Sequence, residues 1–213
     1  MPQPLLITFE GGEATGKSTQ VRQLSASLRD AGHKVVTVAE PGGTELGARL
    51  RRLVKFGQMP IGPRAEALLF VAARAQLVEE VMAPALADGA VVVSDRFGDS
   101  TLAYQGYGRG LDVEELRGLN AAATGGLQPD LTVLLDLPVD LALMRRQPRG
   151  GDRFEAGLAK ADAADVAFHL RVREGFLTLA AQEPERWLVV NATLPRREVA
   201  RVVRERVSGM LAE

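Results

Sequence analysis

An eight-residue stretch near the start of the chain has the residue types and the spacing of a phosphate-binding P-loop. It fits the pattern G-x-x-x-x-G-K-[ST] and reads Gly11-Gly12-Glu13-Ala14-Thr15-Gly16-Lys17-Ser18. The glycines let the backbone approach phosphate oxygens, and successive N–H groups make a concave site for an anion. In such a loop Lys17 reaches the β- and γ-phosphates of a nucleotide, and the Ser18 hydroxyl ligates Mg²⁺. The stretch therefore predicts a nucleotide site with Mg²⁺ as its metal.

A second candidate for phosphate chemistry is the pair Asp95-Arg96, which directly follows the apolar run 90–94. A carboxylate at the end of a buried strand in a P-loop protein typically holds the metal, often through water. We therefore predict that Asp95 shares the metal site with Ser18. The guanidinium of Arg96 is suited to neutralising a phosphate. A simple turn cap is the plainer interpretation of this pair.

Four arginines lie within nine residues of a loop rich in proline and glycine: Arg145, Arg146, Arg149 and Arg153. One interpretation is a solvated basic loop. The other is a mobile lid over about residues 147–158, in which Arg149 and Arg153 neutralise charge in the transition state. Excluding water favours phosphoryl transfer because water is a competing acceptor. Given the P-loop, we favour the lid and give both arginines catalytic roles.

Two further groups of residues are suited to holding an acceptor. One is a turn after a predicted strand, at the position where ligands of open α/β sheets lie, and it reads Glu40-Pro41-Gly42-Gly43-Thr44. The other is the pair Phe70 and Arg74, which are one helical turn apart and share a face. The ring is suited to stacking on a base and the guanidinium to bonding its edge. A buried phenylalanine beside a surface arginine explains the same spacing and stays open.

The elements that must position these residues alternate between strands and helices. Short apolar, β-prone runs predict strands at 5–9, 34–39, 90–94, 131–135 and 187–190. Apolar residues at helical spacing predict helices at 17–30, 46–56, 64–82, 112–123, 138–146, 164–181 and 195–210, with a glycine-spaced loop at 97–111. This alternation favours right-handed parallel crossovers. We expect one α/β domain over residues 1–213, with a P-loop NTPase-type, doubly wound, five-stranded parallel sheet flanked by helices.

Composition excludes several classes of function. The formal net charge of −1 gives no bulk electrostatic attraction to nucleic acid or to a membrane surface. With no cysteine and two histidines, disulfides and thiolate metal sites are excluded and a histidine-rich site is disfavoured. No apolar run approaches the ~18 residues of a membrane span, and the N-terminus lacks a basic signal region. We expect a cytoplasmic protein that acts on small molecules.

Beyond single motifs, the chain resembles the bacterial thymidylate (dTMP) kinase family over nearly its whole length and in the same order. The stretches that carry the resemblance, besides the P-loop, are Phe9-Glu10, Glu40-Pro41-Gly42-Gly43-Thr44, Leu68-Leu69-Phe70, Arg74-Ala75-Gln76, Asp95-Arg96-Phe97, Ser100-Thr101, Ala103-Tyr104-Gln105-Gly106, Asp152-Arg153-Phe154-Glu155 and Arg171-Val172-Arg173 with Phe176. The resemblance implies phosphorylation of dTMP to dTDP by MgATP, in a homodimer. The absence of an arginine inside Glu13-Ala14-Thr15 resembles the subtype whose positive charge comes from the lid.

The resemblance also implies roles for individual residues in binding dTMP. Arg96 matches the arginine that holds the acceptor phosphate, aided by one that matches Arg51 in the helix after the Glu40-Pro41 turn. Glu13 and Tyr104 match residues beside the sugar, where the tyrosine disfavours a ribose hydroxyl. The remaining matches concern the base and its pocket: Phe70 stacks on thymine, Arg74 bonds the base edge, and Ser100 and Gln105 line the base and sugar pocket.

Three other kinds of P-loop protein are alternatives to this family. A GTPase is disfavoured, because Asp95-Arg96-Phe97-Gly98 fits D-x-x-G but no N-K-x-D motif accompanies it. A kinase for dUMP or for a deoxynucleoside would use the same scaffold. A nucleotide-dependent switch would bind ATP without any need for an acceptor pocket.

Overall fold

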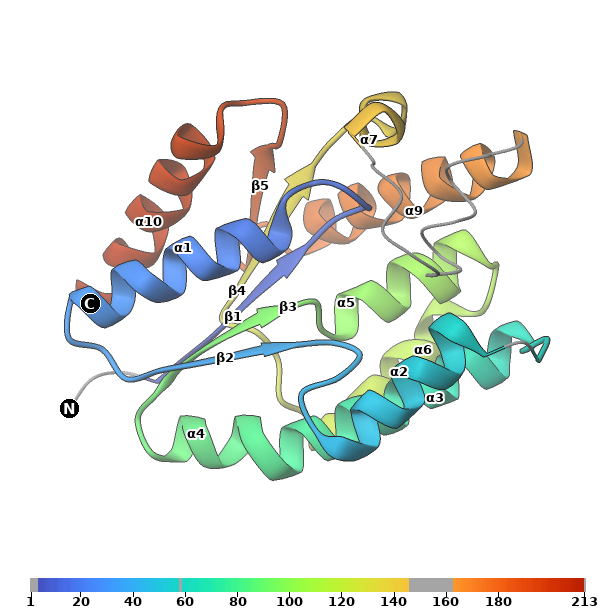
Figure 1. Cartoon of the computed structure of the whole chain (residues 1–213), viewed down its shortest axis with the longest axis horizontal. Coiled ribbons are helices and arrows are strands. Elements are labelled where there is room, and N and C mark those ends of the chain that lie inside the picture. The colour runs from blue at the N-terminus through green and yellow to red at the C-terminus, as the bar shows by residue number, and fades with distance from the viewer. Residues whose placement is uncertain (1–3, 58, 146–162, 213) are drawn as a thin grey trace.

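Five parallel strands form one sheet in the computed structural model, which describes residues 4–57, 59–145 and 163–212 (Figure 1). The strands lie in the order β2-β3-β1-β4-β5. Their bounds are β1 (Leu5–Glu10), β2 (Val35–Ala39), β3 (Val91–Asp95), β4 (Leu131–Asp136) and β5 (Trp187–Asn191). Because all five are parallel, their carboxyl ends meet at one edge of the sheet. The predicted doubly wound sheet is confirmed.

Helices connect the strands and cover both faces of the sheet (Figure 1). Their bounds are α1 (Lys17–Asp30), α2 (Glu45–Phe56), α3 (Pro63–Leu77), α4 (Ala83–Ala87), α5 (Gly98–Thr101), α6 (Val113–Thr124), α7 (Val139–Arg145), α9 (Ala163–Gln182) and α10 (Arg196–Ala212). Two π-helical segments, η1 (Val78–Met82) and η2 (Leu102–Gly108), continue α3 and α5. Side-chain caps fix two helix starts: Thr44 Oγ1 accepts from the Gly47 N–H, and Asp112 Oδ1 accepts from the Glu115 N–H.

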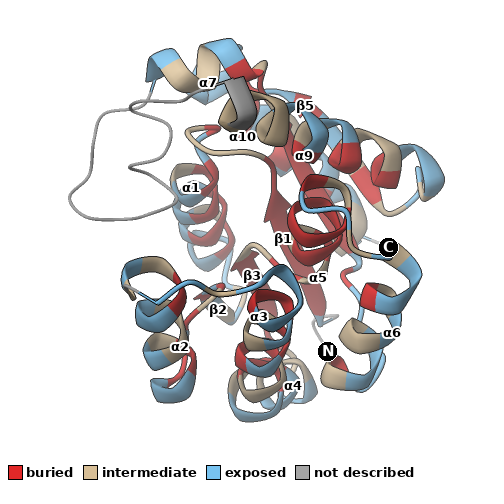
Figure 2. Cartoon of the chain, turned by 90° about the vertical axis from the view of Figure 1, so that its right-hand side faces the viewer, coloured by how far each residue is buried: buried red, intermediate tan, exposed pale blue. Residues whose placement is uncertain are grey.

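Alternation along the strands divides the core between the two faces of the sheet. Ile7, Val93 and Val133 point to one face and pack with α1 and α10. Leu6 and Val92 point to the other face and pack with η1, and Leu134 on that face packs with η2 and α9. Figure 2 shows the buried sheet between these helical layers. The sheet is therefore a rigid platform, buried on both faces, for the residues at its carboxyl edge.

A buried polar layer lies on the second face of the sheet, beneath α5. The Thr8 and Thr132 hydroxyls lie 3.1 Å apart on the neighbouring strands β1 and β4. The Arg186 guanidinium, just before β5, makes hydrogen bonds of 2.7 and 3.1 Å to the two carboxylate oxygens of Asp99 in α5. It also donates to the Thr132 hydroxyl. This layer ties the helix that follows Asp95-Arg96 directly to the sheet.

The segment 97–111, predicted as a loop, is mostly helical, and that prediction is wrong. Helix α5 runs directly into η2, whose Leu102, Ala103 and Tyr104 are buried against α9. The glycines permit close packing: a Cβ at Gly108 would lie 2.6 Å from the Phe168 ring. The glycine spacing that favoured a loop therefore marks contact with another helix.

Two further features of the fold concern single segments. Within residues 4–57, 59–145 and 163–212, no helix combines the length and the hydropathy that crossing a membrane requires.

Trp187, the one tryptophan of the chain, is buried at the start of β5. Its indole N–H makes no hydrogen bond with the part of the chain that the structure describes.

Candidate active site

The P-loop connects β1 to α1, as the sequence predicts. Gly11 and Gly16 have φ angles of 133° and 96°, in the region that favours glycine. A Cβ at Gly11 would lie 2.6 Å from the Leu135 carbonyl oxygen, so the neighbouring strand leaves room only for a hydrogen. No side chain caps the N-terminus of α1 at Gly16. The first N–H groups of α1 are therefore open to an anion.

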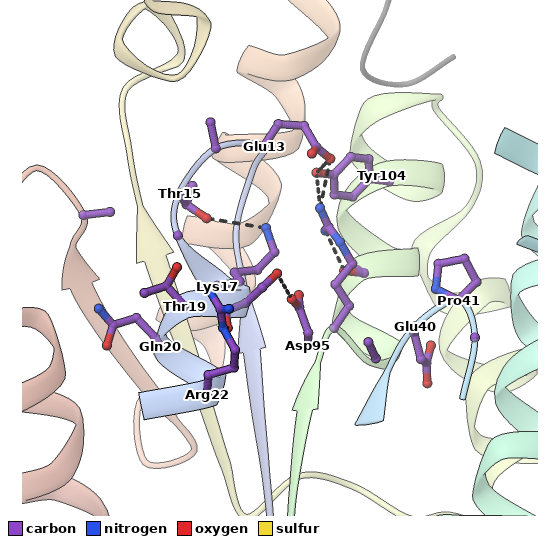
Figure 3. A pocket seen from close by; sticks show the side chains of 18 of the residues that line it. Glu13, Thr15, Lys17, Thr19, Gln20, Arg22, Glu40, Pro41, Asp95 and Tyr104 are labelled. Atoms are coloured by element: carbon purple, nitrogen blue, oxygen red, sulfur yellow. Dashed lines mark hydrogen bonds and ion pairs between the residues drawn. The ribbon is translucent and has the colours of Figure 1, made fainter. Parts of the chain in front are cut away.

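Lys17 lies across the loop that it belongs to (Figure 3). Its ammonium donates to the carbonyl oxygens of Gly11 at 3.1 Å and Gly12 at 2.7 Å, and to Thr15 Oγ1 at 3.4 Å. Burial, reinforced by the positive charge of Arg96, lowers the pKa of Lys17 to about 8. Phosphate oxygens are better partners for an ammonium than these carbonyls, so the side chain is poised to exchange them for a nucleotide.

Ser18 and Asp95 meet at the mouth of the loop. The Ser18 hydroxyl donates to Asp95 Oδ2 at 2.6 Å, across from α1 to the end of β3. The sequence names both residues as metal ligands, and the fold brings them together. Two oxygen ligands side by side suit Mg²⁺, which usually takes one or two protein oxygens and completes its shell with phosphates and water.

Arg96 is the centre of a charged cluster on the other side of the loop. One terminal nitrogen donates to Glu13 Oε1 at 3.0 Å and to the Tyr104 hydroxyl at 3.2 Å, and the other donates to Ser100 Oγ at 3.1 Å. The guanidinium also lies 4.9 Å from the centre of the Tyr104 ring. Burial opposes its charge, but Tyr104 and the carboxylates of Glu13 and Glu10 outweigh burial and raise the pKa of Arg96. Arg96 therefore remains a cation in the cleft.

Glu10 supports this cluster, although the sequence did not single it out as a site residue. Its carboxylate accepts from the Phe97 N–H at 2.7 Å and from the Ser100 hydroxyl at 2.6 Å. These bonds fix the turn in which Arg96 takes a φ of 80°, unusual for a residue other than glycine. Burial and the charge of Asp99 raise the pKa of Glu10 to about 7. The signal that could have identified Glu10 is its position, because it is a glutamate at the last residue of a mostly apolar strand.

On the far side of the cleft, Arg74 is almost completely buried. It pairs with Glu40 at 2.7 Å and donates to Thr101 Oγ1, Asn120 Oδ1 and the Phe97 carbonyl oxygen. With a further bond from Nε to Glu40, all five N–H groups of the guanidinium have protein acceptors. The sequence left two interpretations of Arg74 open, a surface arginine and an arginine that bonds the edge of a base. Arg74 is buried, so the first interpretation is wrong. Under the second, contact with a base edge would require Arg74 to exchange one of these hydrogen bonds.

One cleft of about 1300 Å³ contains almost the whole predicted site. Its lining includes, from the P-loop and the acceptor side, Glu13, Ala14, Thr15, Gly16, Lys17, Ser18, Glu40, Pro41, Arg51, Phe70, Arg74, Asp95, Arg96, Ser100, Tyr104 and Gln105. Gly11 and Gly12 instead line a small cavity behind the loop. Arg51 donates to the Pro41 carbonyl oxygen at 3.2 Å. The predicted lid, with Arg149 and Arg153, lies outside the described residues.

The cleft also extends to residues that the sequence analysis missed. They lie in α1, after β5 and at the start of α10: Thr19, Arg22, Ala192, Thr193, Leu194 and Arg196. Arg145 at the end of α7, which the sequence analysis grouped with the arginines of the predicted lid, lines the cleft as well. Arg145 donates to the Ala192 carbonyl oxygen at 2.8 Å, which joins α7 to the loop after β5. The loop after β5 could have been found by the rule that ligands lie beyond the carboxyl ends of parallel strands.

A parallel sheet with a P-loop and a second, arginine-lined site in the same cleft defines a P-loop phosphotransferase. The family model described as thymidylate kinase matches residues 9–203. The chain belongs to the thymidylate kinase family.

Similar proteins support this membership over nearly the whole chain. A thymidylate kinase of Deinococcus radiodurans is 52% identical over 200 residues, which cover 93% of this chain and 94% of that protein. One from Desulfovibrio desulfuricans is 50% identical over 214 residues, covering 97% and 96%. The crystal structure of thymidylate kinase from Ehrlichia chaffeensis superposes with a TM-score of 0.79 at 31% identity, covering 97% of this chain and 99% of that one. The predicted family and enzyme class, a nucleoside monophosphate kinase that phosphorylates dTMP, are confirmed.

Proposed function

We propose that this chain transfers the γ-phosphoryl group of MgATP to dTMP, and that the residues of the described cleft divide between the two substrates. The observation that carries the proposal is the meeting of Lys17 and Ser18 with Arg96 and Glu13 at one sheet edge, in a single cleft. Two nucleotides carry phosphates that repel each other. Cationic groups from separate elements are therefore needed to hold them in line.

On the donor side, the backbone of the P-loop binds the phosphates of ATP and Lys17 contacts the β- and γ-phosphates. Ser18 and Asp95 would hold Mg²⁺, which would supply positive charge to offset the negative charge of the ATP phosphates. The 2.6 Å contact between Ser18 Oγ and Asp95 Oδ2 supports this assignment. The roles of Arg149 and Arg153 stay predictions.

On the acceptor side, Arg96 binds the phosphate of dTMP, with Arg51 as a second cation. Phe70 stacks on thymine, and Glu13 and Tyr104 contact the deoxyribose, with the tyrosine opposing a ribose 2′-hydroxyl. Glu40 and Pro41 close the pocket behind the base. The cluster around Arg96 supports these roles, since its hydrogen bonds to Glu13 and Tyr104 hold sugar-side and phosphate-side groups in one unit.

The reaction needs no general base. A phosphate oxygen of dTMP is already ionised at neutral pH, so it attacks the γ-phosphorus directly. A new P–O bond to dTMP forms as the bond to the leaving ADP oxygen breaks. The protein contributes alignment and charge stabilisation.

We also propose a homodimer that acts in the cytoplasm. Apolar side chains are exposed on the neighbouring helices α2 and α3: Leu46 at 43%, Leu53 at 36%, Phe56 at 47% and Leu68 at 47%. The two helices pack side by side (Figure 2). Grouped exposed apolar residues are typical of a protein interface.

The first test is ADP formation from MgATP by the purified chain with dTMP, dUMP, ribo-TMP, dCMP or no acceptor. We expect strong turnover with dTMP, weaker turnover with dUMP and little with the ribonucleotide. Equal ADP formation without an acceptor would instead identify an ATPase or a nucleotide-dependent switch. A preference for dUMP would identify a kinase of different specificity on the same scaffold.

A further inference from the structure

Gln105 presents an unsatisfied oxygen to the cleft. The residue is 2% exposed, lies in η2 and lines the cleft beside Tyr104 and Phe70. Its amide nitrogen donates to Glu66 Oε1 at 3.0 Å. Within the described part of the chain, its side-chain carbonyl oxygen has no donor. Because this oxygen is not among the buried side-chain atoms that lack a partner, it reaches the open space of the cleft, where it can accept a hydrogen bond from a donor on a ligand.

Glu66 determines which end of that amide faces the cleft. The carboxylate is 5% exposed and is held by two hydrogen bonds from Arg109, of 2.7 and 2.9 Å. An ionised carboxylate only accepts hydrogen bonds. If the Gln105 amide turned over, its oxygen would face the Glu66 oxygen and no proton would lie between them. The amide nitrogen is therefore bound towards Glu66, and the carbonyl oxygen is left on the side of the cleft.

The position of Glu66 on α3 relates this pair to the base site. Glu66 and Phe70 are one helical turn apart and share a face of α3, and Phe70 lines the cleft. Arg109, the partner of Glu66, lies 5.4 Å from the centre of the Phe168 ring, so its guanidinium is packed as well as paired. One helix face thus supplies the proposed stacking ring and the group that orients the neighbouring amide.

We propose that Glu66 is a positioning residue, which fixes the Gln105 amide so that its carbonyl oxygen accepts a hydrogen bond from the nucleoside of the acceptor nucleotide. The inference rests on the proposed function, with dTMP as acceptor. Thymidine has two donors of this kind, the N3–H of the base and the 3′-hydroxyl of the sugar. Both have the same chemistry, and the experiment distinguishes them.

The test compares wild type with Glu66→Gln, which gives position 66 a donor and lets the Gln105 amide turn over. The loss of one neutral hydrogen bond predicts a KM for dTMP raised about fivefold, with kcat within about twofold of wild type. The matched control is Arg109→Lys, which perturbs the same ion pair but keeps the carboxylate facing Gln105. Its KM should stay within about twofold of wild type. If Glu66→Gln does not fold, the charge-balanced variant Glu66→Gln with Arg109→Gln takes its place.

Substrate analogues then separate positioning from general stability. With 3-methyl-dTMP or 3′-deoxy-dTMP, one donor is absent, and the KM difference between variant and wild type should vanish for the analogue that lacks the bonded donor. A KM difference that is equal for dTMP and both analogues would overturn the proposal, as would a fall in kcat at unchanged KM. Failure of the proposed function is distinct, because wild type itself would then not phosphorylate dTMP.

Discussion

At the scale of single residues, the cleft holds charged groups that burial has moved away from their usual behaviour. Lys17 and Glu10 are both buried, and each favours its neutral form more than it would in water. The consequence of this shift differs between the two residues. Lys17 needs its charge to bind phosphate, whereas Glu10 needs only to accept hydrogen bonds from the Phe97 N–H and the Ser100 hydroxyl.

The first prediction concerns the charge of Lys17. Because its pKa is lowered to about 8, the cation is lost above that pH rather than above the usual range of lysine. We expect kcat/KM for MgATP to be flat from pH 6.5 to about 7.5 and to fall by up to about tenfold per pH unit well above pH 8. Steady-state kinetics across this range would measure it. Lys17→Arg, whose charge does not titrate here, is the control, and an equal fall in that variant would contradict the assignment.

The second prediction concerns Glu10 and stability. Its folded-state pKa of about 7 is above the usual glutamate value of 4.5, so the folded chain holds this proton more tightly than the unfolded chain does. The stabilisation is present below about pH 4.5 and is lost as pH rises through 7. Relative to Glu10→Gln, wild type should lose up to about 3 kcal/mol of unfolding free energy between pH 4.5 and 7.5. Urea unfolding at both pH values would measure the difference. If wild type and Glu10→Gln differed in unfolding free energy by the same amount at both pH values, the raised pKa of Glu10 would be refuted.

At the scale of elements, η2 and α9 pack closely against each other along one joint. Glycines on both sides of the joint permit it, because a Cβ at Gly108 would lie 2.6 Å from Phe168 and one at Gly175 would lie 2.6 Å from the Tyr107 ring. Tyr104, in the same segment η2, also packs edge-on against Phe176 of α9 at 6.0 Å. The joint therefore determines where Tyr104 and Gln105 stand in the cleft.

The third prediction is that Gly175→Ala destabilises the chain although alanine is the better helix former. The added methyl group would force the Tyr107 ring to move, which predicts a loss of about 2 kcal/mol. Gly118→Ala in α6 is the matched control, because a Cβ there has open space and should stabilise the helix by about 0.5–1 kcal/mol. Chemical denaturation of both variants measures the contrast. Similar effects of the two substitutions on stability would show that the packing between η2 and α9 can accommodate the added methyl group.

The strands, the P-loop and the meeting of Ser18 with Asp95 could be predicted from sequence, because strand runs are short and apolar and parallel strands bring their carboxyl ends together. The helix of residues 98–108 could not be predicted, since its glycines pack against α9 and that contact depends on the whole fold. Glu66 was missed for a related reason. A glutamate at the start of a helix looks like a solvated charge until the fold places Arg109 and Gln105 beside it.

At the scale of the whole molecule, two neighbouring surfaces matter, the cleft at the edge of the sheet and an exposed apolar face on α2 and α3. The carboxyl edge of the sheet carries the cleft, which Phe56 of α2 also lines, while Leu46, Leu53 and Leu68 of α2 and α3 form an exposed apolar face beside it. Since α2 also supplies Arg51, Arg52 and Lys55 to the cleft, a partner bound on this face would steady one wall of the acceptor site. The single domain predicted for residues 1–213 stays a prediction.

The fourth prediction concerns that face. Leu53→Asp with Leu68→Asp places two charges among the exposed apolar residues and should convert a dimer to a monomer, because unpaired buried charge at an interface costs several kcal/mol. Light scattering after size-exclusion chromatography measures the mass. Arg64→Asp, a similarly exposed change on α3, should leave the mass unchanged. A double variant that keeps the wild-type mass would place the interface elsewhere.

The buried position of Trp187 has a practical consequence for all these measurements. As the one tryptophan of the chain, it is a fluorescence reporter that needs no label. Its ring packs within the core formed by β4, η2 and α9, and it is not among the residues that line the cleft. Its emission should therefore shift to longer wavelength when this half of the core opens, yet stay nearly constant when nucleotides bind. The same sample can thus be followed optically for unfolding while its turnover is assayed.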